Sequence, residues 1–410
     1  MKGKGTVAAL VLLALLALPA AAQAPNFSRI VVLGDSLSAG YIDGGLHQYG
    51  QEHAYCQRIA EQVGHPLTLP LISYPGIPIC LRLAGFDSNG LPILEPAGTT
   101  MGSLMNPLAQ PTDIAVPGHT SLDLVNKKPE GPPDTLTDII LGFPGFYLGG
   151  QPARSQLEMA AVLQPTFVIL WIGANDTLGG ALSGDPANTI PTSVFKQTFP
   201  AILNALKATG AKIVVGNIPN VTVIPALTTG RYLKDLGVPL KVLGITPADY
   251  VTPAGMNHVK AILAGQAQGP LTASEVLTRK EAEQIKKIVL EDNKVIAKAC
   301  KAAGVPVADI YHEVNRVHKA GYQLPNGQKI YTTFLGGIFS LDGVHPTYTG
   351  QAIIANAYID AINKGYKTSI PHVDVMETNL RDPWGIALAP GALPQFDLSA
   401  YEPILERWKN

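Results

Sequence analysis

The sequence predicts an α/β protein built on a mostly parallel sheet that is covered by helices. Two observations support this: short apolar runs alternate with longer helical patterns, and polar residues with useful chemistry directly follow several of those runs. With 46% hydrophobic and 15% charged residues among 410, the chain can bury a sizeable core. This composition excludes a largely disordered protein.

Short apolar, β-branched runs bounded by Gly, Pro, Asn or Asp have the composition of buried strands. Because strands of a helix-covered parallel sheet are buried on both faces, they read as continuous apolar runs without alternation. The expected strands span residues 30–33, 113–116, 167–172, 212–215 and 305–310.

Helical patterns separate these runs. The clearest spans residues 279–303, where Ile285, Val289 and Ile296 fall on one side and charged residues on the other. The other expected helices span residues 52–63, 153–163, 193–209 and 348–363.

Charge and glycine content narrow the function classes further. The formal net charge of -1 and the pI near 6.8 leave no basic excess for neutralising phosphates, so nucleic acid is not an expected partner. The 41 glycines and 34 prolines indicate long irregular loops between the regular elements.

The first residues have the pattern of a secretory signal peptide. Lys2 and Lys4 precede an apolar run at 7–18, and small residues follow at 20–24. We expect residues 1–22 to be removed by cleavage after Ala22, which would leave a secreted or periplasmic protein without a stable membrane anchor. The alternative is an uncleaved anchor, but the run is shorter than the roughly 20 residues of a membrane span.

Three cysteines allow two interpretations. Cys56 and Cys80 flank a loop rich in proline and glycine and could form a disulfide in an oxidising compartment, with Cys300 as a buried thiol. Alternatively, all three are unpaired buried thiols that pack as small hydrophobic residues.

Polar residues at the ends of the predicted strands form the expected site. Ser36 follows the first strand, Gly118 the second and Asn175 the third, while Asp342 and His345 lie in the loop region after the fifth. In open α/β sheets ligands bind outside the carboxyl ends of the strands, so these residues should converge.

This set is suited to acyl transfer. A histidine can take the proton of a serine hydroxyl, and a carboxylate on its other nitrogen fixes the tautomer, which assigns Ser36 as nucleophile, His345 as base and Asp342 as its partner. The N–H groups of Ser36 and Gly118 and the Asn175 amide are candidate donors to the oxyanion. Activity should then fall as acid protonates the imidazole.

Each residue alone has a simpler interpretation. Ser36 and Asn175 could cap helices, Gly118 could be an ordinary turn glycine, and His345 could be a loop residue. We expect the neighbouring Asp35 to order the turn through backbone hydrogen bonds, without a part in the chemistry. Asp176 should act similarly.

The segment Gly-Asp-Ser-Leu-Ser-Ala-Gly at 34–40 resembles the first block of the GDSL, or SGNH, hydrolase superfamily. Gly118, Asn175, and Asp342 with His345 match its remaining blocks in order, and residues 339–347 resemble the last block of secreted bacterial members. The resemblance implies a flavodoxin-like three-layer α/β/α sandwich with about five parallel strands. It further implies a Ser-His-Asp triad that hydrolyses carboxylic esters without metal or cofactor.

Long insertions enlarge the expected hydrolase domain, 26–366, at about 65–111, 126–151 and 221–277. They could form an apolar substrate pocket, with Phe143, Phe146, Tyr147 and His119 as lining candidates, or bury one another as a satellite core. The tail, 367–410, carries enough apolar residues to pack on the domain.

The function expected from these features is a secreted esterase or lipase acting on small-molecule or lipid esters. A polysaccharide O-deacetylase of the same superfamily is the first alternative, and a catalytically silent binding protein that keeps the fold is the second. The apolar insertions favour hydrophobic esters.

Overall fold

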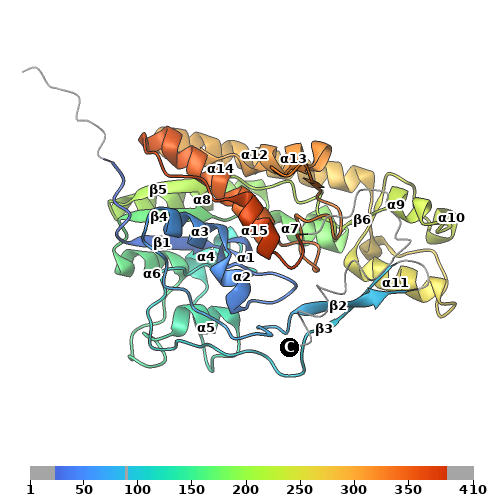
Figure 1. Cartoon of the computed structure of the whole chain (residues 1–410), viewed down its shortest axis with the longest axis horizontal. Helices are drawn as coiled ribbons and strands as arrows, with labels where there is room; N and C mark the ends of the chain where they lie inside the picture. The colour runs from blue at the N-terminus through green and yellow to red at the C-terminus, as the bar shows by residue number, and fades with distance from the viewer. Residues whose placement is uncertain (1–23, 88–90, 386–410) are drawn as a thin grey trace, which may run out of the picture.

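The computed structural model describes residues 24–87 and 91–385 (Figure 1). Its central sheet contains the strands β1 (Ile30–Gly34), β4 (Phe167–Trp171), β5 (Lys212–Gly216) and β9 (Val307–Ala308). They pair in the order β1-β4-β5-β9, and every pair is parallel. The predicted α/β fold with a central parallel sheet is therefore confirmed.

The second predicted strand forms an edge segment beside β1. Thr112 O accepts a hydrogen bond from Val32 N, Ile114 N donates to Val32 O, and Val116 N donates to Gly34 O, at 2.9, 3.0 and 3.2 Å. Only one parallel bridge forms, because Gly34 N, which a second bridge would need, donates to Gln156 Oε1 and not to Ile114 O. In chain order the five segments have the arrangement 2-1-3-4-5 that is typical of flavodoxin-like sheets.

The last strand is shorter than expected. The sequence predicts residues 305–310, but β9 covers Val307–Ala308 only. Pro306 precedes the strand, and Asp309 already caps the next helix, α13 (Ile310–Ala320), by accepting from His312 N.

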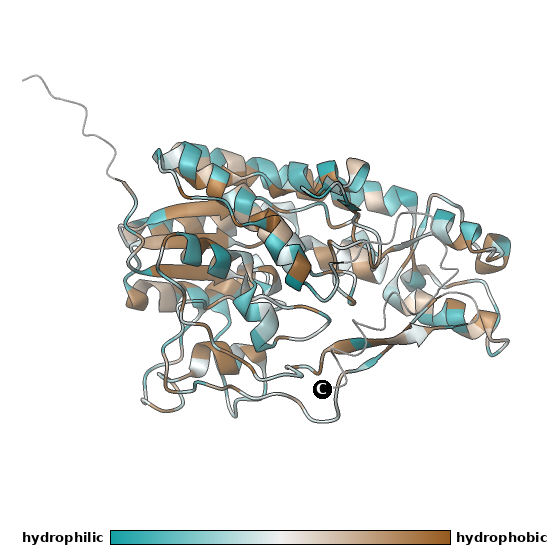
Figure 2. Ribbon diagram, in the orientation of Figure 1, coloured by the Kyte–Doolittle hydropathy of each residue, from teal (hydrophilic) through white to brown (hydrophobic). Residues whose placement is uncertain are grey.

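Helices cover both faces of the sheet. The helices α3 (Tyr55–Gln62) and α14 (Tyr348–Tyr366) pack together on one face, where α14 also contacts β5 and β9. On the other face lie α4 (Ser121–Asn126), α6 (Gln156–Leu163), α8 (Thr192–Ala208) and α12 (Arg279–Ala303). Figure 2 shows the apolar strands between helices whose outer surfaces are hydrophilic.

The burial of the sheet on both faces explains why apolar and polar residues do not alternate along its strands. All residues of β1 and β4 are buried, and Trp171 and Phe167 are among the largest fully buried side chains. The helix expected at 279–303 has these same bounds, with a capping box between Thr278 and Glu281 and a left-handed Gly304 at its end. The helix expected at 52–63 is divided into α2 (Gln48–Glu52) and α3, because Ala54 has an extended ψ of 142°.

The insertions contain regular structure of their own. The first holds the hairpin of β2 (Leu81–Phe86) and β3 (Pro92–Pro96), and the second holds α5 (Leu136–Gly142). Figure 1 shows the third beside that hairpin, at one end of the molecule. It comprises β6 (Thr228–Thr229), α9 (Gly230–Asp235), α10 (Leu240–Leu243), β7 (Tyr250–Val251), α11 (Pro253–Leu263) and β8 (Val276–Leu277).

The third insertion buries its own apolar side chains, including Leu233, Val251 and Val259. Lys260 on α11 donates to Pro92 O at 2.9 Å and so joins this unit to the hairpin. The satellite-core interpretation therefore applies to this insertion.

After α14 the chain forms α15 (Val375–Arg381), which packs on α14. The tail is thus packed on the domain as far as it is described, through the buried Asp382 and Trp384. The predicted signal peptide and the rest of the tail, 386–410, lie outside the described residues. Among the helices that the structure describes, none has the length and apolar character of a membrane span.

The three cysteines are free and buried. Cys56 on α3 faces the core, where its thiol donates to Ser38 O at 3.1 Å. Cys80 lies at the base of the β2–β3 hairpin, so the disulfide interpretation is wrong and the interpretation as unpaired thiols is right.

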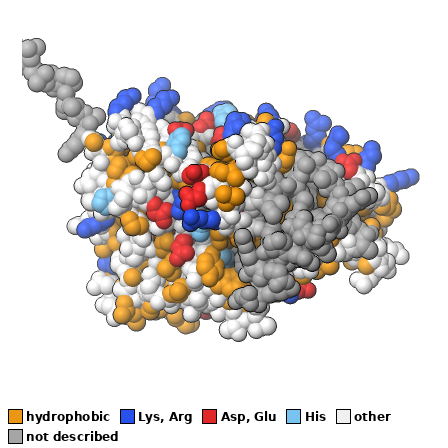
Figure 3. Space-filling model, in the orientation of Figure 1, with side chains coloured by type: hydrophobic (Ala, Val, Ile, Leu, Met, Phe, Trp, Pro, Cys, Tyr) orange, Lys and Arg blue, Asp and Glu red, His pale blue; other side chains and the backbone are white. Residues whose placement is uncertain are grey.

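Charged side chains of both signs are spread over the face in Figure 3.

Candidate active site

Ser36 is the first residue of a short helix, α1 (Ser36–Ala39), that begins where β1 ends. Asp35 caps this helix by accepting a hydrogen bond from Leu37 N at 3.0 Å, the ordering role expected from the sequence. Gly34 is required here, because a Cβ atom would lie 2.4 Å from Trp171 O. The sharp turn holds Ser36 at the carboxyl edge of the sheet with 7% of its surface exposed.

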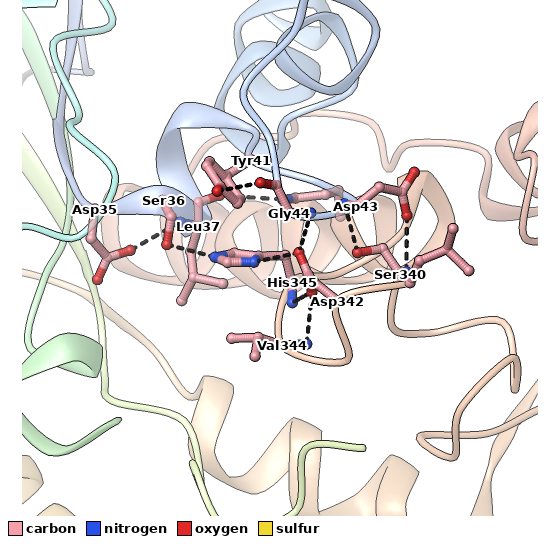
Figure 4. Close-up of polar contacts among 12 residues, drawn as sticks. Asp35, Ser36, Leu37, Tyr41, Asp43, Gly44, Ser340, Asp342, Val344 and His345 are labelled. Atoms are coloured by element: carbon pink, nitrogen blue, oxygen red, sulfur yellow. Dashed lines mark hydrogen bonds and ion pairs between the residues drawn. The ribbon is translucent and has the colours of Figure 1, made fainter. Parts of the chain in front are cut away.

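The loop after β9 and α13 brings His345 to Ser36. His345 Nε2 lies 2.8 Å from Ser36 Oγ, and His345 Nδ1 lies 2.8 Å from Asp342 Oδ2 (Figure 4). The side chains of His345 and Asp342 are each 12% exposed. The three residues predicted to act together therefore form one continuous hydrogen-bonded chain.

The Asp342 carboxylate is fully hydrogen-bonded. Oδ1 accepts from the backbone N–H groups of Val344 and His345, and Oδ2 accepts from Gly44 N in addition to His345 Nδ1, all at 2.8 Å. Burial acts to raise the pKa of Asp342, but His345 and these N–H groups outweigh it and hold the pKa below its ordinary value. Asp342 is therefore an anion that can orient an imidazole and stabilise its protonated form.

The predicted oxyanion donors lie on three different segments. Gly118 is exposed in a turn with a φ of 82°, and Asn175 lies in the first turn of α7 (Ala174–Ser183). Asn175 Nδ2 donates one hydrogen to His119 O at 3.0 Å, which leaves the second hydrogen free for a ligand. Within the described chain, the N–H groups of Ser36 and Gly118 donate to no protein acceptor.

Asp176 fixes the two donor-bearing segments to each other. Its carboxylate accepts hydrogen bonds from Ser121 N, at 2.8 Å, and from Ser121 Oγ. Ser121 begins α4, directly after the turn that contains Gly118, while Asp176 follows Asn175. This agrees with the structural role expected for Asp176.

A cavity of about 80 Å³ opens beside Ser36, Asn175 and His345. Its wall is mostly apolar and comes from β4, α7, the loop after β5, α13 and the start of α14. Six of the residues that form it are Trp171, Leu178, Ile224, Val314, Phe339 and Ile354.

The aromatic residues suggested as pocket lining lie elsewhere. Phe143, Phe146 and Tyr147 pack on one another after α5, with ring centroids 5.0 and 4.9 Å apart, and none of them lines this cavity. His119 is also absent from the lining, because it is buried between Thr137 and Gln156. Of the insertions proposed as pocket wall, the third contributes Val221 and Ile224; most of the remaining wall comes from elements that the sequence analysis did not propose as lining.

Sequence reasoning also missed the loop at 41–44, which contacts Asp342 and His345. Besides the hydrogen bond from Gly44 to Asp342, the Tyr41 ring lies against His345 with centroids 4.7 Å apart. The dipeptide Asp43-Gly44 is a signal that could have indicated a tight turn here.

In the ranges 24–87 and 91–385, no three His, Cys, Asp or Glu side chains converge in a way that could hold a metal ion. The site as described consists of protein groups that can deliver a proton, a nucleophile and hydrogen-bond donors to an ester carbonyl.

Fold and site together have the arrangement of a serine hydrolase. Residues 30–358 match the family described as GDSL-like Lipase/Acylhydrolase. The chain therefore belongs to the GDSL-like, or SGNH, hydrolase family of serine ester hydrolases.

Solved structures similar to this chain include three hydrolases, each 13% identical to it. The lipase/acylhydrolase from Enterococcus faecalis has a TM-score of 0.35, over 84% of this chain and 100% of that one. A variant of an acetyl xylan esterase from Geobacillus stearothermophilus has a TM-score of 0.36, over 81% and 93%. An alpha/beta hydrolase enzyme from the metagenome of Lake Arreo, Spain, has a TM-score of 0.37, over 85% and 100%. A search of curated proteins found no match.

Proposed function

We propose that the protein is a secreted serine esterase or lipase that hydrolyses carboxylic esters with hydrophobic acyl groups. The observation that carries the proposal is the position of the Ser36–His345–Asp342 chain at the opening of a largely apolar cavity. Membership of an ester hydrolase family supports the reaction class.

In the proposed mechanism, His345 Nε2 takes the proton of Ser36 Oγ while the oxygen attacks the ester carbonyl carbon. Asp342 holds His345 in the tautomer whose Nε2 lone pair faces Ser36, because Nδ1–H donates to Oδ2. The oxyanion then accepts hydrogen bonds from the free donors of Ser36, Gly118 and Asn175, each worth about 3–4 kcal/mol of barrier in comparable sites.

His345 next returns its proton to the departing alcohol, which leaves the acyl group on Ser36. Water attacks this acyl-enzyme with His345 again as base, and the carboxylic acid departs as Ser36 regains its proton. The position of Ser36, His345 and Asn175 at the carboxyl edge of the sheet supports this sequence of steps.

The cavity supports the choice of substrate class. An acetyl group has a single methyl and gains little from a long apolar wall, whereas each buried CH₂ of a longer chain contributes about 0.8 kcal/mol. Apolar residues such as Leu178, Ile224 and Val314 therefore favour longer acyl chains over acetyl esters of polysaccharides. Export rests on the signal-peptide pattern at 1–22, and an N-terminal sequence of the mature protein beginning at Gln23 would test it.

The function can be tested with a panel of p-nitrophenyl esters of graded acyl length beside acetylated xylan. We expect kcat/KM to rise from acetyl to medium-length chains, and we expect Ser36→Ala to abolish turnover. A fluorophosphonate should add covalently to Ser36, which peptide mass analysis would detect. Ser103→Ala is the matched control, because Ser103 is exposed and is not among the residues that line the cavity.

Three outcomes would contradict the proposal. Turnover retained by a folded Ser36→Ala variant would remove the acyl-enzyme mechanism. A preference for acetylated xylan over every p-nitrophenyl ester would instead favour the O-deacetylase alternative. Binding of esters without turnover by the wild-type protein would favour the silent binding protein.

A further inference from the structure

A two-residue turn behind the catalytic loop has an unusual backbone. Asp43 and Gly44 have φ angles of 54° and 79°, and Ile42 and Gly45 exchange two hydrogen bonds of 3.0 Å across them. These features define a type I′ turn, for which Asp-Gly is a favoured sequence. Asp43 therefore has a left-handed backbone that short polar residues tolerate, and its side chain is free for another role.

The Asp43 carboxylate joins two distant segments. Oδ1 accepts from Leu341 N at 2.9 Å, and Oδ2 accepts from the indole Nε1 of Trp384 at 3.1 Å. In the other direction, Asp43 N donates to Ser340 Oγ at 3.0 Å. Asp43 is 2% exposed and Trp384 is 5% exposed, so these contacts are protected from water.

The same turn reaches the catalytic carboxylate directly. Gly44 N, the next backbone donor, lies 2.8 Å from Asp342 Oδ2, the oxygen that also faces His345 (Figure 4). Three successive residues, Ser340, Leu341 and Asp342, thus each form a hydrogen bond with the turn. Rotation of the turn would move the N–H group that aligns Asp342.

We propose that Asp43 is a positioning residue for the Ser36–His345–Asp342 site, clamped in place by Trp384 of the C-terminal segment. The inference rests on the proposed function. Asp43 touches neither the serine nor the histidine, so its effect is carried by the turn and by Asp342.

The chemistry of the two contacts explains why an aspartate is used. Both partners are N–H donors, so the side chain must offer two acceptor oxygens at once. Asparagine forms the same turn equally well but has one acceptor and one donor, so one contact becomes donor against donor. Asp43→Asn therefore preserves the turn and disturbs only the clamp.

The test measures kcat, KM and the pH dependence of kcat/KM for p-nitrophenyl butyrate. Because burial raises the pKa of Asp43 to about 7, rates are compared at about pH 8.5, where the carboxylate is ionised. We expect Asp43→Asn to lower kcat about tenfold with KM unchanged within about twofold, since substrate contacts are intact. The acid limb of the profile should move to lower pH, because a displaced Asp342 stabilises the His345 imidazolium less.

A double mutant separates the clamp from general destabilisation. In Asp43→Asn/Trp384→Phe the amide can keep its oxygen on Leu341 N, because the opposing indole N–H is gone. We therefore expect the double variant to be at least as active as Asp43→Asn alone. If the two residues acted independently, the losses of activity from the two single substitutions would add. Ser340→Ala, which removes the acceptor of Asp43 N, provides a second variant should Asp43→Asn not fold.

Asp360→Asn is the matched control, because Asp360 lies on the exposed surface of α14 with a side chain 70% exposed. The inference would be overturned if folded Asp43→Asn and Ser340→Ala both kept the wild-type kcat and the wild-type acid limb. It would also be overturned if the loss of kcat in the double variant equalled the combined losses of Asp43→Asn and Trp384→Phe. Failure of the proposed function is distinguishable, because wild-type protein would then show no Ser36-dependent turnover.

Discussion

The side-chain amide of Gln156 hydrogen-bonds both backbone groups of Gly34, two residues before Ser36. Oε1 accepts from Gly34 N at 3.0 Å, and Nε2 donates to Gly34 O at 2.9 Å and to His119 Nδ1 at 2.9 Å. Nδ1 of His119 must therefore be the acceptor, so Nε2–H donates to Thr137 Oγ1. Burial lowers the pKa of His119 to about 4, which keeps this neutral tautomer.

This relationship predicts that Gln156→Leu disturbs the nucleophile turn. The variant removes both hydrogen bonds from Gly34 in a buried position, at a cost of about 1–3 kcal/mol in the free energy of unfolding. Denaturant unfolding and kcat on one ester would check it. We expect both quantities to fall, whereas Gln284→Leu, at an exposed position on α12, should change neither; unchanged stability in Gln156→Leu would contradict the argument.

Gly118→Ala tests the oxyanion donor together with backbone strain. A Cβ atom at Gly118 has free space, but the φ of 82° is unfavourable for alanine, so the turn should shift. Gly327 has a φ of 87° and equal free space in a distant hairpin, which makes Gly327→Ala the matched control for strain. We expect similar losses of stability in both variants and a fall in kcat of about 10²–10³ in Gly118→Ala alone. An equal fall in both variants would mean that Gly118 supplies no donor.

Narrowing the cavity should change the preferred acyl length. Val314 lies on α13 in the cavity wall, so Val314→Phe reduces the space available to a long chain. We expect kcat/KM for a long-chain ester to fall at least about tenfold, while that for acetate stays within about threefold. Val162→Phe, at a residue 53% exposed on α6, is the control. An unchanged profile across the ester panel would show that the acyl chain binds elsewhere.

The buried carboxylate of Asp292 should lower the free energy of unfolding as pH rises from about 4 to about 6. Neither of its carboxylate oxygens has a hydrogen-bond partner in the described chain, and the residue is fully buried within α12. Burial raises the pKa of Asp292 to about 6 from an ordinary 3.8. It outweighs the opposing effects of the nearby Thr192 hydroxyl, which lies outside hydrogen-bonding geometry, and of the Lys196 charge. Below about pH 4 the folded and unfolded states both hold the proton, so the penalty develops from there and is complete above about pH 6.

Asp292→Asn removes this charge. We expect the variant to be more stable than wild type by about 1–3 kcal/mol at about pH 8, and the difference to shrink toward about pH 4. Thermal unfolding of both proteins at the two pH values would measure it. The exposed Asp235→Asn should show no such dependence. A pH-independent difference for Asp292→Asn would mean that the carboxylate is not the cause.

Sequence reasoning located the parts of the site that depend on local pattern. Gly34 to Ser36 and Asn175 each follow a strand of the sheet, so the sheet brings them to one edge, and the loop that carries Asp342 and His345 returns to that edge after α13. The cavity wall could not be located in this way, because an apolar residue such as Val314 looks the same whether it faces a cavity or the core. The edge segment at 113–116 was predicted as a strand, but its incomplete pairing was not, because Gly34 N donates to the distant Gln156 side chain.

The support behind the triad was missed for a different reason. Asp43 and Trp384 are separated by 341 residues, and no local pattern connects a turn to an indole so far along the chain. The Asp43-Gly44 signal predicts the turn but not its partner. Contacts of this kind follow from tertiary packing alone.

The separation of Asp43 from Trp384 also bears on how the enzyme becomes active during its production. Ser36 and its histidine are 309 residues apart, and the clamp on Asp43 uses a residue beyond both. A nascent chain can therefore form β1 and its first helices long before it can cleave an ester. In the proposed mechanism, ester cleavage therefore waits until His345 has been synthesised and packed against Ser36, and the Trp384 contact is added only afterwards.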